Sequence, residues 1–591
     1  MRWTLKSQVI GLFLVAVGCL FIISGLRGGS SACEKTICPA TNCVHPVDSA
    51  DGQEPKEFDV NLRHVGCTVD GGKKMQCIRD GDDVFFPFNS FLRKHLDVTG
   101  KLVTDAKTSE DRFEWVTSYS KVRRPPESEY DPVGPFGHFG TYSVETRDRV
   151  RCISAVHGVP MSTQWGPDPY FYPIQIAQYA LQHYSRNFTE PPPRTQTLGL
   201  NSNSWSISPD YGRSSKISEK FDHSIKEKVV EIDTDPKLEN PGAFLTLNSD
   251  PELHVVQFGW LGSADASFTV IVERLDTKQF VKLNYVRVDD SRCVWADQDT
   301  EQTFTYALGA RQDPSWTTVT RDVLVDVGRA LLTTVNGGKK AAPELLFKTG
   351  DVRLVTLAFR GQVTVVQRVS QRNSAHLEQF LTAADWFLSN QDELGGWSVP
   401  VERSIADKRL VLEAGWHSAM AQGHAMSVLT RAFAVTNDSR YLIAANKAVK
   451  LFDVDARDGG VRNVLLGVPW YEEYPTTPGS FVLNGFMYSL IGLYDLSRAV
   501  ARQTDADAHR LFKQGMESLK KLLPFYDTGS GSAYDLRHVA LRVAPNLARW
   551  DYHTVHVYQL LWLFNIDKDA FLNETAERWA SYAQGRRAKH N

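Results

Sequence analysis

The spacing of hydrophobic positions changes along this 591-residue chain. Residues 8–26, QVIGLFLVAVGCLFIISGL, form an uncharged apolar run. Between residues 186 and 365, segments such as HVVQFGWL, FTVIVERL and VKLNYVRV alternate apolar and polar positions, as half-buried strands do. From about residue 374, segments such as HSAMAQGHAMSVLTRAFAV and FVLNGFMYSLIGLYDLSRAV repeat apolar residues at i, i+3, i+4 and i+7, which is typical of amphipathic helices. The pattern predicts an α+β multidomain protein with an antiparallel β-sandwich or barrel followed by a helical domain.

The first apolar run is long enough to cross a membrane. At ~1.5 Å rise per residue it reaches ~30 Å, the thickness of the hydrocarbon core. Arg2 and Lys6 precede it, and a cleaved signal has a shorter apolar core of about 7–15 residues. We therefore expect an uncleaved anchor with the basic N-terminus in the cytosol and the remainder in a lumen, the type II topology of many Golgi-resident enzymes. A cleaved signal, which gives a secreted protein, is the alternative.

The loops between the predicted helices are long and rich in Gly, Trp and Pro. Such helix pairs suggest an α/α-barrel, or toroid, that carries an active site on the loops of one rim. The complete expected organisation is a cytosolic tip (1–7), transmembrane anchor (8–26), luminal stem (27–80), N-terminal β-hairpin and groove region of short strands and rigid loops (81–185), β-sandwich (186–370) and α/α-barrel (371–591).

Cysteines and glycosylation motifs agree with a luminal location. Cys33–Cys43 is a candidate stem bridge or interchain link, and Cys67 with Cys77 a candidate hairpin bridge. The cysteine and histidine spacings do not match a zinc site. Sequons at Asn187, Asn437 and Asn573 are open to glycans if the chain is luminal.

The overall charge limits the partners. With a net charge of −3 and a pI near 6.6, the chain has no global basic field, so nucleic acid is not the expected ligand. An anionic partner must instead meet local clusters such as 121–124 and 147–151, whose alternative interpretation is a solvated surface.

Two stretches near the C-terminus concentrate reactive side chains. In the first, Glu472, Glu473 and Tyr474 lie among Trp470, Pro469 and Pro475, which favours a fixed loop. A carboxylate beside aromatic rings is partly desolvated, and the raised pKa suits general acid or base work, although a solvated acidic pair is the alternative. The second stretch supplies Tyr534, Arg537, His538, Asn546, Arg549, Asp551, Tyr552 and His553.

Carboxylate, phenol and guanidinium groups together suit proton abstraction next to a bound carboxylate. Removing the α proton builds an enediolate, which a guanidinium stabilises and a phenol can reprotonate. Arginines that only bridge loops are the alternative. His538 and His553 lack a third ligand at metal spacing, so hydrogen bonding is favoured for them. Asp527-Thr-Gly529 is a single short match to aspartic proteases, which need two such loops, and is better interpreted as a turn that presents Tyr534.

Four long strings resemble the D-glucuronyl C5-epimerases of heparan sulfate and heparin synthesis: STQWGPDPYFYPIQIAQYAL, WYEEYPTTPGSFVLNGFMYSLIGLYDL, YDTGSGSAYDLRH and APNLARWDYHT. The resemblance runs from about residue 149 to the C-terminus. It implies inversion at C5 of D-glucuronate to L-iduronate within N-sulfated heparosan. It also implies a homodimer, no cofactor for the chemistry, and a structural calcium ion with Asp222 aligned to one ligand position.

The resemblance also implies roles for individual residues. Proton transfer falls on Glu473 with Tyr474, and on Tyr552; further essential tyrosines fall on Tyr534 and Tyr130. The positions that contact the polysaccharide in this family fall on Tyr142, Arg147, Arg149, Gln164, Tyr172, Arg403, Asn484, Tyr488, Arg537, Asn546, Arg549, Trp550, Asp551 and His553.

Two rival functions use the same residue types. A polysaccharide lyase begins with the same C5 proton abstraction and then expels the C4 substituent, leaving an unsaturated uronate. A non-catalytic glycan-binding protein has affinity for the polymer but exchanges no C5 hydrogen.

Overall fold

The computed structural model describes residues 62–69, 73–92, 99–104, 109–116, 121–209, 215–237, 242–297, 302–310, 315–334, 347–499 and 506–589. The predicted tip, anchor and Cys33–Cys43 bridge lie outside these ranges. Within them, no helix combines the length and the apolar character that a membrane span needs. The chain divides into two compact units, Met1–Pro87 and Phe88–Asn591.

The first unit holds a three-stranded antiparallel sheet of β1 (Arg63–Val69), β2 (Lys73–Asp80) and β3 (Asp83–Phe85). A disulfide joins Cys67 on β1 to Cys77 on β2, which confirms the predicted hairpin bridge. Strands therefore begin inside the segment that was expected to be stem. The second unit begins with a π-helical turn (Phe88–Leu92), followed by another hairpin, β4 (Thr99–Thr104) and β5 (Asp111–Val116).

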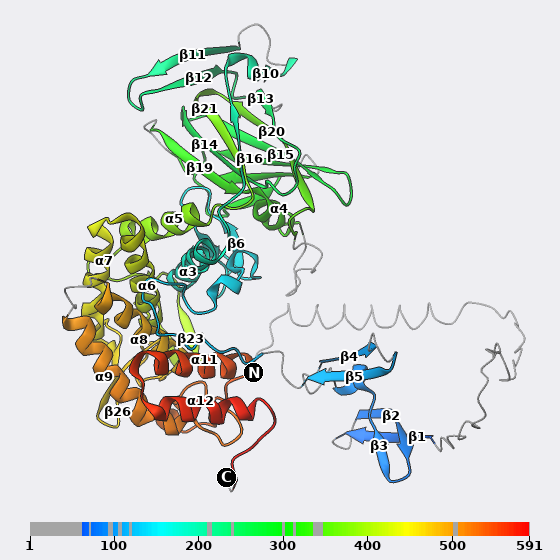
Figure 1. The fold of residues 1–591 in the computed structure, drawn as a ribbon, viewed down its shortest axis with the longest axis vertical. Coiled ribbons are helices and arrows are strands. Elements are labelled where there is room, and N and C mark those ends of the chain that lie inside the picture. Colours follow the sequence, from blue (N-terminus) through cyan, green and yellow to red (C-terminus); the bar gives the residue numbers. More distant parts are fainter. Residues whose placement is uncertain are drawn as a thin grey trace, which may run out of the picture. The chain divides into compact units, whose positions relative to one another are not determined.

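The period-two segments form a β-sandwich, as predicted (Figure 1). In spatial order, one sheet contains β10 (Ser206–Ile207), β13 (Ala243–Thr246), β20 (Val352–Arg360), β15 (Ser267–Arg274), β16 (Phe280–Val286), β18 (Thr303–Ala307) and β17 (Val294–Ala296). The other contains β11 (Lys216–Asp222), β12 (Glu227–Asp233), β21 (Gln362–Arg372), β14 (Val255–Gly262) and β19 (Thr317–Asp322), with β9 (Thr195–Gly199) paired to β21.

Aromatic residues fill the sandwich core. Phe268 stacks on Tyr285 with ring centroids 4.4 Å apart, and Phe258 meets Phe359 edge to face at 5.3 Å. All strand pairs of the two sheets are antiparallel except β16 with β18, which are parallel. The alternating pattern works here because every second side chain of a strand such as β14 points into this core.

The C-terminal region is helical, again as predicted. Its helices are α5 (His376–Ser389), α6 (Ala419–Thr436), α7 (Ser439–Val449), α8 (Leu483–Arg498), α9 (Ala506–Leu522), α10 (Arg537–Leu541), α11 (Trp550–Asp567) and α12 (Ala570–Tyr582). Three two-stranded hairpins or pairs interrupt them: β22 (Ser398–Val399) with β25 (Trp416–His417), β23 (Arg403–Ile405) with β24 (Leu410–Leu412), and β26 (Arg462–Leu465) with β27 (Val468–Tyr471).

Helix α3 (Pro173–Thr189) differs from expectation, because its segment was assigned largely to a region of strands and loops. Pro173 occupies the first turn, where a missing N–H costs nothing, so the proline-rich stretch ends where the helix begins. The helix packs against α5 and α6 and is therefore part of the helical domain. The preceding strands β6 (Val150–Ile153), β7 (Pro160–Ser162) and β8 (Tyr170–Phe171) form a small sheet.

The small sheet also joins the sandwich. A disulfide that the sequence did not reveal links Cys152 on β6 to Cys293. The buried Arg321 pairs with Asp326 at 2.5 Å and donates to the carbonyl oxygen of Ile153 at 2.9 Å. Helix α4 (Val323–Leu331) carries Asp326. These contacts tie the sandwich to the segment that leads into the helical domain.

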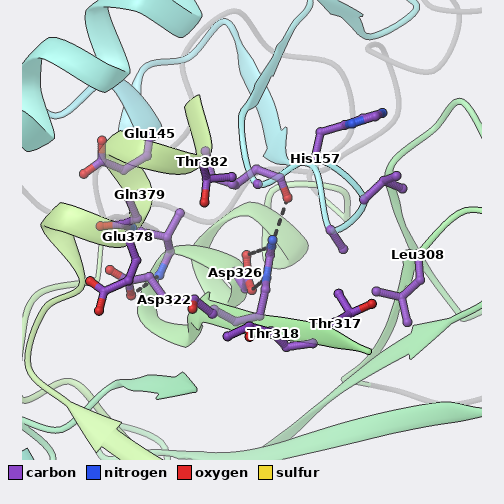
Figure 2. Close-up of a pocket in the computed structure, with 18 of the residues that line it drawn as sticks. Glu145, His157, Leu308, Thr317, Thr318, Asp322, Asp326, Glu378, Gln379 and Thr382 are labelled. Atoms are coloured by element: carbon purple, nitrogen blue, oxygen red, sulfur yellow. Dashed lines mark hydrogen bonds and ion pairs between the residues drawn. The ribbon is translucent and has the colours of Figure 1, made fainter. Parts of the chain in front are cut away.

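A cavity of about 170 Å³ lies at this junction (Figure 2). Glu145, Asp322 and Glu378 line it from three separate segments. The nearby Arg321 and Asp326 form an ion pair with each other, and the Tyr285 hydroxyl donates a further 2.6 Å hydrogen bond to Asp326. The junction is therefore a structural clamp, and the reactive residues predicted from the sequence lie elsewhere.

Candidate active site

The loop between β27 and α8 holds two adjacent glutamates in different environments. Glu472 is 0% exposed and accepts hydrogen bonds from Asn463 Nδ2 at 3.0 Å, Ser480 Oγ at 3.0 Å and the Phe481 N–H at 2.9 Å. Burial raises the pKa of Glu472 to about 8 against the effect of these donors. Because all its partners belong to its own loop and hairpin, Glu472 fixes the loop. The alternative of a solvated acidic pair is wrong.

Glu473 has few partners and is 5% exposed. The Tyr474 hydroxyl donates a hydrogen bond to it, and Asn484 Nδ2 lies 3.5 Å from Oε2. Burial raises the pKa of Glu473 to about 7; Tyr474 and Arg403 oppose the rise, and Asp535 adds to it. A carboxyl group that is about half ionised at neutral pH suits a general base.

The first turn of α8 packs directly on this carboxylate. A Cβ at Gly485 would lie 2.4 Å from Glu473 Oε2 and 2.5 Å from its Cβ, well inside van der Waals contact. Only a residue without a side chain fits there, so the helix backbone sets the position of the carboxylate.

Several phenols lie within electrostatic range of Glu473. The rings of Tyr534 and Tyr552 meet edge to face with centroids 4.9 Å apart. Burial, followed by the charge of Glu473, raises the pKa of both phenols. The pKa of Tyr172 is also raised, by burial first and then by Tyr474 and Glu473. All three are therefore neutral near pH 7 and able to donate a proton. Tyr552 is 37% exposed, so this phenol is accessible from outside.

A cleft of about 540 Å³ borders these phenols and is lined by Tyr474, Tyr534 and two arginines. Arg403, at the start of the β23–β24 hairpin, stacks over Trp165 at 4.9 Å from the ring centroid. Arg537 is held by Asp535 at 3.1 Å. The cleft thus offers two guanidiniums to an anionic ligand beside a buried base.

Asp535 organises the far side of the cleft. It is buried, pairs with Arg537 and accepts a 2.7 Å hydrogen bond from Asn546 Nδ2. The backbone oxygen of Asn546 in turn accepts a 2.7 Å hydrogen bond from the Tyr534 N–H. The geometry combines a desolvated carboxylate, neutral phenols and fixed cations, which suits removal and return of a proton next to a bound carboxylate.

Comparison with known proteins agrees with this chemistry. The family model "D-glucuronyl C5-epimerase C-terminus" matches residues 391–581, and "D-glucuronyl C5-epimerase, beta-sandwich domain" matches residues 226–362. A D-glucuronyl C5-epimerase from Caenorhabditis elegans is 51% identical over 626 aligned positions, which cover 100% of both chains. This chain belongs to the D-glucuronyl C5-epimerase family. An uncharacterized protein from Methanocaldococcus jannaschii is 32% identical over 172 residues, covering 28% of this chain and 53% of that protein.

Several other positions expected for this family gather next to the phenols. Arg147 lies over the Tyr142 ring, 5.2 Å from its centroid, and the hydroxyl groups of Tyr142 and Tyr488 are hydrogen-bonded. Burial lowers the pKa of Arg147, and Tyr552 is among the groups whose charge opposes this change. The cluster of Tyr142, Arg147 and Tyr488 therefore lies near the Tyr534–Tyr552 pair. Tyr488 lies one turn after Asn484 on α8, which places both on one helix face.

The remaining polar positions lie at the edge of this region. Arg149 is exposed. Burial raises the pKa of the Tyr552 phenol, and the positive charge of Arg149 opposes this rise. Arg549 pairs with Asp551 at 2.6 Å at the start of α11 and lies 6.0 Å from the Tyr552 ring centroid. Gln164 precedes Trp165 in the loop after β7 and is partly buried. The half-buried Trp550 follows Arg549 and has its ring 5.3 Å from that of His553.

Two predicted site residues lie away from Glu473. His553 is fully buried; its Nδ1 pairs with Ser532 Oγ at 2.8 Å and its Nε2 with the Trp579 carbonyl oxygen at 2.8 Å. A histidine so enclosed supports the packing of α11 on α12. The predicted direct contact of His553 with a polysaccharide is therefore wrong.

Tyr130 is the second. Its hydroxyl donates to Asp495 at 2.7 Å and accepts from Arg431 at 3.0 Å. Asp495 lies eleven residues after Asn484 on α8, about 16 Å along the helix axis, so the Tyr130 hydroxyl cannot reach a group bound at Glu473. The structure gives Tyr130 a place in a buried ion-pair network rather than in proton transfer.

Asp222, the predicted calcium ligand, ends strand β11 on the sandwich. Its carboxylate is exposed to solvent and accepts hydrogen bonds from the Ser224 N–H at 2.8 Å and Oγ at 2.6 Å. Calcium prefers six to eight oxygen ligands. Among the residues the structure describes, no group of three or more His, Cys, Asp or Glu side chains is placed to hold a metal, and the calcium site at Asp222 stays a prediction.

Sequence reasoning missed three residues of the site. The Trp416 ring lies 5.8 Å from that of Tyr474, Gly485 contacts the Glu473 carboxylate, and Asp535 holds Arg537. Gly485 carried a signal, because an isolated glycine within a helical pattern often marks a close approach. Asp535 and Trp416 had no comparable signal, since only the fold brings their loops together.

Proposed function

We propose that this protein is an isomerase that inverts C5 of D-glucuronyl residues to L-iduronyl residues within N-sulfated heparosan, in heparan sulfate and heparin biosynthesis. The observation that carries the proposal is the buried Glu473, with a pKa of about 7, placed beside neutral Tyr534 and Tyr552 in a chain of the C5-epimerase family. Arg403 and Arg537 supply the positive charge that a uronate carboxylate requires.

The reaction proceeds by proton transfer at C5. Ionised Glu473 takes the C5 proton, and the electron pair of the C–H bond moves into the uronate carboxylate to give an enediolate. The arginines of the cleft stabilise the added negative charge. Tyr552 then donates its phenolic proton to the opposite face of C5, which forms the inverted C–H bond and restores the carboxylate. Protons exchanged with solvent return Glu473 and Tyr552 to their starting states, so no net oxidation or reduction occurs.

A hydrogen-exchange experiment tests this function. The full chain is incubated with N-sulfated heparosan in D₂O, and deuterium at C5 and iduronate content are measured. The wild type is expected to give both. Glu473→Gln and Tyr552→Phe are expected to lose at least about a hundredfold in exchange rate while still binding the polymer.

Different products would contradict the proposal. An unsaturated uronate would identify a lyase, and polymer binding by the wild type without any C5 exchange would identify a glycan-binding protein. Unimpaired exchange in both variants would remove the two-group mechanism.

We further infer that the helices form an α/α-barrel. The inner helices α3, α6, α8 and α11 contact one another in that order, and α5, α7, α9 and α12 each pack against at least one of them (Figure 1). Between α11 and α3, the aromatic segment around Phe136 packs against Trp562 at 4.8 Å. This arrangement supports a ring whose last gap is filled by a loop.

The membrane and assembly properties remain part of the proposal. The apolar run 8–26 after Arg2 and Lys6 supports a type II Golgi membrane protein with the catalytic part in the lumen. The observed Cys67–Cys77 disulfide suits an oxidising lumen. Homodimerisation is proposed by family resemblance and is tested by measuring the mass of the full chain in solution.

A further inference from the structure

A second groove, distinct from the arginine cleft, adjoins the reactive cluster. Its volume is about 330 Å³, and its lining includes Lys121, Arg123, His138, Tyr142 and Val555. Lys121 and Arg123 come from the extended segment before α3 and Val555 from α11, so residues more than four hundred positions apart form one groove.

The groove adjoins the proposed reaction site. Tyr142 lines it and also contacts Arg147 and Tyr488 of the cluster described above. On the opposite wall, Val555 lies three residues after Tyr552, and therefore on the same face of α11. The groove therefore lies next to Tyr552, within reach of a chain molecule whose reacting sugar is bound there.

The charge of the groove favours an anion. Lys121 and Arg123 are both exposed and contribute two positive charges, and no carboxylate occurs among the described residues that line it. Arg123 Nη1 donates to Thr141 Oγ1 at 2.5 Å, which holds one end of the guanidinium in place.

His138 contributes a polar edge without a charge. Burial, followed by the charge of Arg123, lowers the pKa of His138 to about 4, so its ring is neutral at the pH of a cell. The ring is fixed between Tyr558, at 4.5 Å, and Tyr142, at 5.3 Å. Its buried Nδ1 has no hydrogen-bond partner among the described residues.

The neighbouring Arg124 provides a contrast within the same segment. Its guanidinium is bound by both carboxylate oxygens of Glu577, on α12. The basic run 121–124 is therefore divided: Lys121 and Arg123 line the groove, whereas Arg124 serves an ion pair with Glu577.

We propose that the groove of Lys121 and Arg123 binds an anionic group of the polysaccharide outside the reacting uronate, and so helps to select the substrate. This inference rests on the proposed function. The group is an oxyanion, either the sulfamate of a neighbouring hexosamine or the carboxylate of the next uronate, because both offer oxygen acceptors to a guanidinium and an ammonium.

The test compares two variants of the full chain. Lys121→Ala/Arg123→Gln removes both groove cations, and Arg124→Gln removes one charge from the same segment without touching the groove. With N-sulfated heparosan, the double variant is expected to raise KM about tenfold, to leave kcat within about twofold of wild type and to weaken the salt dependence of KM. The Arg124→Gln variant is expected to keep both constants within about twofold.

Further arms identify the group and guard against misfolding. Kd is measured for N-sulfated and N-acetylated heparosan. A loss in the double variant confined to the N-sulfated polymer identifies the sulfamate, and an equal loss for both identifies the carboxylate. The single variant Arg123→Lys keeps the charge and is expected to recover most of the affinity.

Two outcomes overturn the inference: a KM of the double variant no higher than that of Arg124→Gln, or a fall in kcat at unchanged KM. Both presuppose an active wild type. A wild-type protein that exchanges no C5 hydrogen refutes the proposed function instead, so the two failures are distinguished.

Discussion

Replacing Glu473 with glutamine should abolish proton transfer and, at the same time, stabilise the protein at alkaline pH. The carboxyl group is 5% exposed, and burial raises its pKa from the ordinary 4.5 to about 7. The folded state therefore holds this proton more tightly than the unfolded state does. The stability contributed by the raised pKa is complete below pH 4.5 and is lost as the pH rises to 7.

The size of this effect follows from the same pKa. A rise from 4.5 to about 7 corresponds to about 3 kcal/mol at ~1.4 kcal/mol per pKa unit. Glutamine has nearly the same shape and no ionisation, so the Glu473→Gln variant escapes this loss. Its stability relative to wild type should rise by about 3 kcal/mol between pH 4.5 and pH 8. If the helical domain unfolds as one unit of about 200 residues, this equals a relative gain of about 7 °C in Tm.

Thermal unfolding of both proteins without polysaccharide, at pH 5 and pH 8, measures this difference. Glu413→Gln, at an exposed position, serves as the control and should shift Tm equally at both pH values. A Tm difference between Glu473→Gln and wild type that is the same at pH 5 and pH 8 would refute the conclusion that Glu473 carries a desolvated, titrating carboxyl group.

Two further predictions test the support of the site. Gly485→Ala places a Cβ 2.4 Å from the Glu473 carboxylate, so we expect kcat in the C5 exchange assay to fall about a hundredfold with little loss of fold. The control Gly531→Ala, where the nearest atom is 3.7 Å from the added Cβ, should be neutral in the same assay. A normal kcat in Gly485→Ala would contradict the packing described. Arg431→Met leaves the buried Asp495 without its 2.7 Å ion pair and should lower the free energy of unfolding by about 3–5 kcal/mol, measured by denaturant titration, whereas a change below about 1 kcal/mol would show that the pair is not important.

The local pattern of the sequence was sufficient where one physical rule decides the outcome. The alternating segments had to form strands with one buried face, and the sandwich follows. The reactive stretch around Glu473 could be recognised because prolines on both sides and the preceding Trp470 favour a fixed, partly desolvated loop. The bridge between Cys67 and Cys77 was predictable because a hairpin brings nearby residues together.

Prediction failed where partners far apart in the sequence decide the role of a residue. Helix α3 was assigned to a region of strands and loops because its neighbours are rich in proline and aromatic residues, yet it packs against α5 and α6. His553 belongs to a string that also contains Tyr552, but the two side chains leave α11 in different directions. Tyr552 is exposed next to Tyr534, whereas His553 is buried against Ser532 and Trp579.

The sequence by itself determined the types of domain, the candidate base and the set of phenols and arginines, because periodicity and residue chemistry are local properties. Only the tertiary structure decided which of these groups work together. It separated the enclosed Glu472 from the titrating Glu473, placed Tyr552 within the electrostatic reach of that carboxylate, and joined Lys121 to Val555 in one groove. Burial and proximity depend on contacts between distant segments, and no local pattern contains them.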